Sequence, residues 1–203
     1  RDVAPSRGLG DVYKRQTVDR NGTMVLYVDG EKPTQGSGFG TNQSAEVDIT
    51  DRSGTIDVMN FVVGADGKKE LGVLDIYLDE LSVYKVALTE EQVRKLSGAW
   101  EAPKDPPVLY ASFDGSDATD DTGRGNDGTV MGSPEFPDGV RGKAIHLTNF
   151  GEAADSTTVE ADQYVNFGTP DDLLFGTGDF SVMFWYKSCL LYTSPSPRDG
   201  ATS

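Results

Sequence analysis

The stretch LDIYLDELSVY, at residues Leu74–Tyr84, decides the fold class of this sequence. Leu74, Ile76 and Leu78 fall on one face of an extended chain and the residues between them on the other, because successive side chains of a strand point to opposite sides. Apolar residues that alternate with polar ones over this length indicate a strand with one face buried and one half-exposed. The stretch therefore predicts a long, half-exposed β-strand.

The same short strand pattern recurs along most of the chain, between clusters of Gly, Asn and Asp. Asn21-Gly22 and Asp29-Gly30 are strong turn signals, since these pairs accept the positive φ angles of tight turns. The sequence predicts an all-β fold, a two-sheet antiparallel β-sandwich. The further predicted strands are Thr23–Gly30, Thr55–Gly64, Val108–Asp114, Lys143–Leu147, Gln163–Phe167 and Phe180–Lys187.

One short helix is predicted in ALTEEQVRKL, Ala87–Leu96. Thr89 as N-cap and Gln92 three residues later form a capping box, in which each side chain bonds the backbone N–H of the other residue. Leu88 and Val93 form the hydrophobic staple that accompanies such a cap. We expect about two helical turns at this point.

Both ends of the chain match the translation of a sequencing adapter. SRGLGDVYKRQ, Ser6–Gln16, translates one strand of a common transposase adapter, and CLLYTSPSPRD, Cys189–Asp199, translates the opposite strand. Segments with an origin outside the gene are set aside before the fold is considered. We expect residues 1–16 and 188–203 to be translated adapter that fits no strand pairing. The alternative is a basic terminal arm and a Pro/Ser-rich tail.

The chain is strongly acidic, with 18 Lys and Arg against 33 Asp and Glu and a net charge of −15. This charge repels phosphate backbones and anionic lipid, so we expect no nucleic acid partner and no membrane insertion. The same charge attracts divalent cations. Cys189, the one cysteine, lies in the expected adapter, so residues 17–187 hold no disulfide and no cysteine nucleophile.

Several motifs resemble those of laminin-G-like, concanavalin A-like jelly-roll modules, and their order is informative. TVDRNGTMVLYVDGEK (17–32) and LDIYLDELSVYKVALTEEQV (74–93) resemble the later part of such a module. VLYASFDGSDATDDTGRGNDGTV (108–130), GVRGKAIHL (139–147) and YVNFGTPDDLLFGTGDFSVMFWYK (164–187) resemble its beginning. The resemblance implies a jelly-roll fold in tandem modules of the same chain.

The reversed order of these motifs implies a particular domain organisation. Residues 17–97 are expected to be the C-terminal half of one module, the Pro-rich residues 98–107 a linker, and residues 108–187 the N-terminal half of a second module. Termini of compact domains often lie close together, so the two halves could close into one circularly permuted sandwich. In that case Leu74–Tyr84 lies beside Val108–Asp114.

Acidic clusters are the chemically suggestive feature of the sequence. Calcium prefers six to eight oxygen ligands, and the loop DGSDATDDTGRGNDG offers carboxylates, amides and carbonyls at short range. We predict that Asp120, Asn126 and Asp79 surround one structural calcium ion, with backbone carbonyls of residues 123–126 completing the shell. The alternative is a solvated acidic turn whose Asp side chains bond their own backbone.

No catalytic residue and no cofactor other than calcium are predicted. Sandwich glycosidases of related shape carry E-x-D-x-x-E on one strand, and Leu74–Glu80 lacks the first Glu. His146, the one histidine, alternates with Ile145 and Leu147 and is expected to be the outward residue of a strand. We therefore expect the chain not to be an enzyme.

Aromatic residues are the usual means by which a module grips a sugar ring. Trp185 is expected to pack in the structure, because the family pattern places this Trp in the core, and Trp100 lies in the expected linker. The resemblance implies a non-catalytic glycan-binding or adhesion module of a larger secreted or cell-surface bacterial protein, with carbohydrate or a cell-surface glycoprotein as partner. The alternatives are a structural spacer repeat and an accessory module of a glycoside hydrolase or sialidase.

Overall fold

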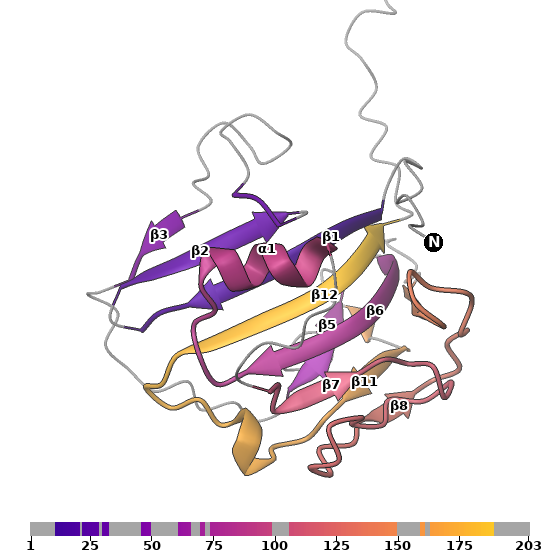
Figure 1. Cartoon of the computed structure of the whole chain (residues 1–203). Coiled ribbons are helices and arrows are strands. Elements are labelled where there is room, and N and C mark those ends of the chain that lie inside the picture. Colours follow the sequence, from indigo (N-terminus) through magenta and orange to yellow (C-terminus); the bar gives the residue numbers. More distant parts are fainter. Residues whose placement is uncertain are drawn as a thin grey trace, which may run out of the picture.

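The long strand predicted from the alternation forms β6, Leu74–Tyr84, with the predicted bounds (Figure 1). The prediction that it is half-exposed is wrong for residues 78–84, which are all buried because other parts of the chain cover both faces of the strand there. The computed structural model describes residues 11–20, 22–28, 30–32, 46–49, 61–65, 70–71, 74–98, 106–149, 159–160 and 163–188. The other elements are β1 Asp11–Val18, β2 Thr23–Val28, β3 Glu46–Asp48, β4 Val62–Val63, β5 Glu70–Leu71, α1 Glu90–Gly98, β7 Leu109–Ala111, β8 Thr129–Met131, β9 Ile145–Asn149, β10 Val159–Glu160, β11 Tyr164–Asn166, the 3₁₀ turn η1 Asp171–Leu173 and β12 Phe180–Ser188.

The strands form an antiparallel sandwich, which confirms the predicted fold class. The main sheet has the order β3-β2-β1-β12-β6-β7, and β9 also pairs with β6. A smaller sheet has the order β4-β11-β8, and β10 pairs with β5. β6 lies beside β7 as expected, with Leu81 opposite Ala111 and Val83 opposite Leu109.

The larger hydrophobic core lies on one face of the main sheet. Side chains of β6, β7, β9 and β11 meet there, and several are fully buried. Complete burial of such a side chain contributes about 1.5–3 kcal/mol to stability. The members with 0% exposed surface are Val83, Leu109, Ala111, Ile145, Leu147 and Val165.

A second, smaller core lies on the opposite face of the main sheet, under α1. Figure 1 shows α1 crossing that face in front of β1 and β2. The residues buried there come from β2, the end of β6, the helix and β12. They are Val25, Tyr27, Tyr84, Leu88, Val93, Leu96 and Met183, with Trp185 packed against them.

Alternation along β12 divides its side chains between these two cores. Phe180, Val182, Phe184 and Tyr186 pack against the larger core, and Met183 belongs to the smaller one. Period-two alternation therefore places β12 between the two hydrophobic clusters, with apolar side chains on both faces.

The helix begins as its cap predicts. The Thr89 N–H donates to Gln92 Oε1 at 2.8 Å, and the Gln92 N–H donates to Thr89 Oγ1 at 3.3 Å, which completes the capping box. Leu88 and Val93, the predicted staple, are both buried in the smaller core. Among the described residues, no helix has the length and apolar character needed to cross a membrane.

A β-bulge interrupts β6 where the strict alternation of the sequence ends. Ser82 is opposite Met183 and Asp79 is opposite Trp185, so two residues of β6, Glu80 and Leu81, oppose a single residue of β12. Glu80 has φ 56°, in the left-handed region that non-glycine residues rarely adopt. The extra residue resets the alternation, and for this reason Leu81, rather than Glu80, faces the larger core.

The expectation that residues 188–203 fit no strand pairing is wrong for Ser188, which lies opposite Ile76 at the end of β12. The same expectation for residues 1–16 is wrong for Asp11–Gln16. These residues form most of β1, which pairs with β12 on one side and β2 on the other. Strand pairing uses backbone N–H and C=O groups, of which only proline lacks the N–H, so these residues can pair in a sheet whatever their origin. Residues 1–10 and 189–203 lie outside the described residues, and so do most of the predicted linker and the start of the predicted strand 55–64.

Candidate functional site

Asp120 organises the acidic loop between β7 and β8. It is buried, and its Oδ1 accepts hydrogen bonds from the Tyr110 N–H at 3.2 Å, the Thr122 N–H at 3.1 Å and the Thr122 hydroxyl at 2.7 Å. Its Oδ2 accepts the Asn126 N–H at 3.1 Å. One carboxylate therefore bonds both the neighbouring strand and the turn of its own loop.

Asn126 ties the same loop to two other parts of the chain. Its Nδ2 donates to the Val108 carbonyl at 2.8 Å and to Asp172 Oδ2 at 3.2 Å. Asp127 Oδ1 accepts the Asp120 N–H at 2.8 Å. These side chains bond nearby backbone, as expected from the alternative interpretation of an acidic turn.

Asp79 bonds different groups from the other two predicted ligands. Its Oδ2 accepts the N–H groups of Val140 at 2.8 Å and Arg141 at 3.0 Å, in the turn between β8 and β9. A Cβ on Gly139 would lie 2.5 Å from this Oδ2, so the turn approaches Asp79 closely only because residue 139 is glycine. The structure joins Asp120 to Asn126, whereas the hydrogen bonds of Asp79 go to this separate turn.

The described residues contain no group of three or more His, Cys, Asp or Glu side chains arranged to hold a metal ion. Asp120 already accepts four hydrogen bonds from protein groups. The predicted calcium ion stays a prediction, with Asp120 and Asn126 as the two expected ligands that lie together.

The β6 bulge creates a buried acid pair that sequence reasoning missed. β9 pairs with residues 74–78 of β6 and β7 with residues 81–83 along the same edge, so neither strand pairs with Asp79 or Glu80. The two side chains are only 2% and 5% exposed. Asp79 Oδ1 is buried without a hydrogen-bond partner. The signal was the DE dipeptide that breaks the alternation in LDIYLDELSVY.

Burial dominates the electrostatics of this pair. Desolvation raises the pKa of Asp79 to about 7, and the charge of Glu80 adds to this, whereas backbone hydrogen bonds from Arg141, Val140 and Glu80 only partly offset the loss of water. Desolvation also raises the pKa of Glu80, against the lowering effects of the Tyr110 hydroxyl and of Arg141, whose Nη1 lies 3.8 Å from Glu80 Oε2. The pKa of the Tyr110 hydroxyl is raised in turn, first by burial and then by the charge of Glu80.

A second polar cluster lies on the face of the main sheet that points away from the larger core. His146 Nε2 lies 2.8 Å from Asp75 Oδ1, and the His146 ring stacks on Tyr77 with centroids 4.0 Å apart. Lys187 Nζ lies 5.6 Å from the centroid of the same Tyr77 ring. His146 is thus the outward residue of its strand, as predicted. We name Asp75, Tyr77, His146 and Lys187 the outer cluster.

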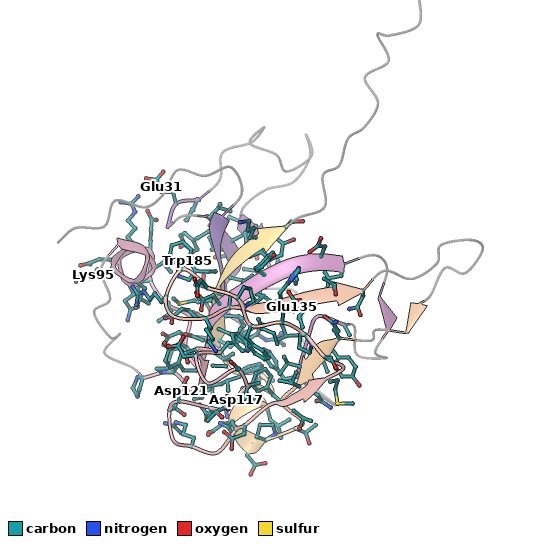
Figure 2. The ribbon with its side chains drawn as sticks, turned by 90° about the vertical axis from the view of Figure 1, so that its right-hand side faces the viewer. Glu31, Lys95, Asp117, Asp121, Glu135 and Trp185 are labelled. Atoms are coloured by element: carbon teal, nitrogen blue, oxygen red, sulfur yellow. The ribbon has the colours of Figure 1, made fainter. Side chains whose placement is uncertain are left out.

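Trp185 packs against the smaller core, in agreement with its predicted structural role. Figure 2 shows Trp185 near the helix. In the same figure, Asp117 and Asp121 lie together in the acidic loop. Trp100 lies outside the described residues.

Comparison with protein-family models, with curated proteins and with solved structures found no match to this chain. The resemblance to laminin-G-like modules therefore depends on the sequence motifs alone. The assignment of the chain as a β-sandwich depends on the strand pairing in the structure.

Proposed function

We propose that the chain is part of a non-catalytic glycan-binding or adhesion module in a larger secreted or cell-surface protein. The antiparallel sandwich and the order of the laminin-G-like motifs support this proposal. A fold alone does not fix a function, because the chemistry of particular side chains decides it.

The use of the carboxylates carries the proposal. Glycoside hydrolysis needs two carboxyl groups that both reach the sugar, one to protonate the leaving oxygen and one to act on the other side of the bond. The adjacent acids Asp79 and Glu80 are almost completely buried, and the Val140–Arg141 backbone bonds directly to Asp79. Asp120 is occupied by its own loop. These acids build loops and strand junctions, which favours a scaffold over a reaction centre.

The outer cluster is the surface on which we propose that a glycan binds. Its side chains offer a carboxylate, an imidazole, a phenol and an ammonium group, which are suitable partners for sugar hydroxyls. The side chains of Asp75 and His146 keep 21% and 16% of their surface exposed, and Lys187 is exposed. The helix covers a different part of this sheet face, because α1 packs over β2 and the start of β12.

A glycan array with the full chain tests this proposal, followed by His146→Ala on any glycan that binds. We expect binding to weaken at least tenfold in His146→Ala. Lys95→Ala is the matched control, since Lys95 is exposed on α1 and pairs with Glu91 at the surface, away from the outer cluster. If both variants lose glycan binding equally, or if His146→Ala loses none, the glycan does not bind at the outer cluster.

The spacer alternative has one observation in its favour. His146 stacks on one face of the Tyr77 ring, and Lys187 lies over the ring as well, so little of its face is open for a sugar ring to stack on. If no glycan binds at high protein concentration, the module is a structural spacer. An accessory role beside a glycoside hydrolase or sialidase predicts a catalytic domain outside these residues.

A further inference from the structure

The chain on either side of the predicted linker contributes alternate strands to the main sheet. We name residues 11–98 the N-segment and residues 106–188 the C-segment. The N-segment supplies β3, β2, β1 and β6, and the C-segment supplies β12, β7 and β9. β12 lies between β1 and β6, as Figure 1 shows. Every described strand that pairs with β6 therefore belongs to the C-segment.

Side chains from both segments also share the larger core. Ile76, Leu78, Leu81 and Val83 of β6 pack in one cluster with Leu109, Ile145 and Leu147 of the C-segment. In the smaller core, Met183 of the C-segment packs among residues of β2 and α1. Neither core consists of one segment alone.

Buried polar contacts join the segments at specific points. Ser181 of β12 is fully buried, and its Oγ accepts the Leu88 N–H at 2.9 Å and donates to the Val86 carbonyl at 2.7 Å. Asp79 accepts the N–H groups of Val140 and Arg141. Contacts of this kind fix the register of one segment on the other, because a buried donor or acceptor without a partner is costly.

Separation of the segments would expose both edges of β6 and its apolar face. Unpaired strand edges and large apolar surfaces associate readily with whatever complements them. The surface that complements β6 in shape and register is the C-segment, whether it belongs to the same chain or to another copy. An identical element from a second copy makes the same contacts, which is the basis of domain swapping.

We propose that the N-segment and the C-segment recognise each other without the linker, so that the partner of each segment is the complementary segment of any copy of this chain. In this proposal the linker serves to raise the local concentration of the two segments. This inference follows from the strand order and does not depend on the proposed function or on the motif resemblance.

Cleavage of the linker tests the proposal on the full chain. A recognition site for a sequence-specific protease replaces residues 102–104, and the purified folded protein is then cut. We expect the two pieces to elute together at the size of the intact chain at about 10 µM, since interfaces that share a core hold at this concentration. Pieces that separate in native buffer would overturn the proposal, as would an isolated N-segment piece that unfolds cooperatively.

Exchange between copies is measured on the cut protein. A light and an isotope-labelled preparation are unfolded together in urea and refolded, and native mass spectrometry counts the pairs. We expect light–heavy hybrids at the statistical ratio. A complete absence of hybrids would overturn the proposal.

A point variant separates specific recognition from nonspecific association. Ser181→Ala leaves the Leu88 N–H and the Val86 carbonyl without their buried partner, so we expect the dissociation constant of the cut pair to rise about tenfold or more. Ser133→Ala, at an exposed position, is the matched control and should change the constant less than twofold. Equal constants for the two variants would show that the pieces associate without this interface.

Discussion

The buried Asp79 should make the stability of the fold depend on pH in a defined direction. Its pKa is about 7 in the folded chain against an ordinary value of 3.8. The folded state therefore holds the proton more tightly than the unfolded state, and the corresponding stability is complete below pH 4 and is lost as the pH rises to about 7. The difference amounts to at most about 4 kcal/mol at pH 8, at about 1.4 kcal/mol for each pH unit.

Asp79→Asn isolates this contribution. The amide oxygen can still accept the Val140 and Arg141 N–H groups, but the side chain carries no charge at any pH. Urea unfolding at pH 4, 5, 6, 7 and 8 gives the free energy of unfolding of variant and parent, and titrating groups that do not interact with Asp79 cancel in the difference. We expect the variant to gain stability relative to the parent as the pH rises.

The control is Asp117→Asn, which replaces an exposed acid in the loop after β7. Its difference from the parent in free energy of unfolding should not depend on pH in the way expected for Asp79→Asn. A pH-independent difference for Asp79→Asn would refute the account of Asp79 as an acid that burial keeps protonated. If the stability of Asp79→Asn relative to the parent fell as the pH rises, a positive group or a cation would be stabilising the charged form of Asp79.

Three further predictions concern other parts of the fold. If the predicted calcium ion binds, the parent melts at a higher temperature in calcium than in a chelator, and Asp120→Ala abolishes this difference. If the parent melts at the same temperature in both, the chain does not bind calcium at this site. Leu147→Ala should lower the free energy of unfolding by about 2–5 kcal/mol, because it leaves a cavity in the larger core. Thr89→Ala should cost about 1 kcal/mol through loss of the helix cap, and no change would mean that the cap is not formed in solution.

Features encoded within a few neighbouring residues could be predicted from the sequence. The alternation of Leu74–Tyr84 gave the bounds of β6, and Thr89 with Gln92 gave the start of the helix. Both follow from local periodicity or from one side chain bonding a backbone group three residues away. The loop that joins Asp120 and Asn126 is local in the same way, since only six positions separate them.

Features that depend on a distant strand could not be predicted in this way. The bulge at Glu80 depends on the register of β6 against β12, roughly a hundred positions later in the chain. The place of Asp79 depends on the turn at Val140 and Arg141, which packs over the bulge. The pairing of Asp11–Gln16 depends on the edge that β12 presents to it. The match of those residues to a translated adapter does not predict whether they pair.

If this sandwich binds a glycan without transforming it, one measurement tests both properties. The full chain is incubated with each glycan that it retains on an array, and mass spectrometry then determines the mass of the recovered glycan. We expect saturable binding that His146→Ala weakens, with the glycan recovered at its original mass. Failure to bind any glycan, or recovery of a cleaved product, would contradict it.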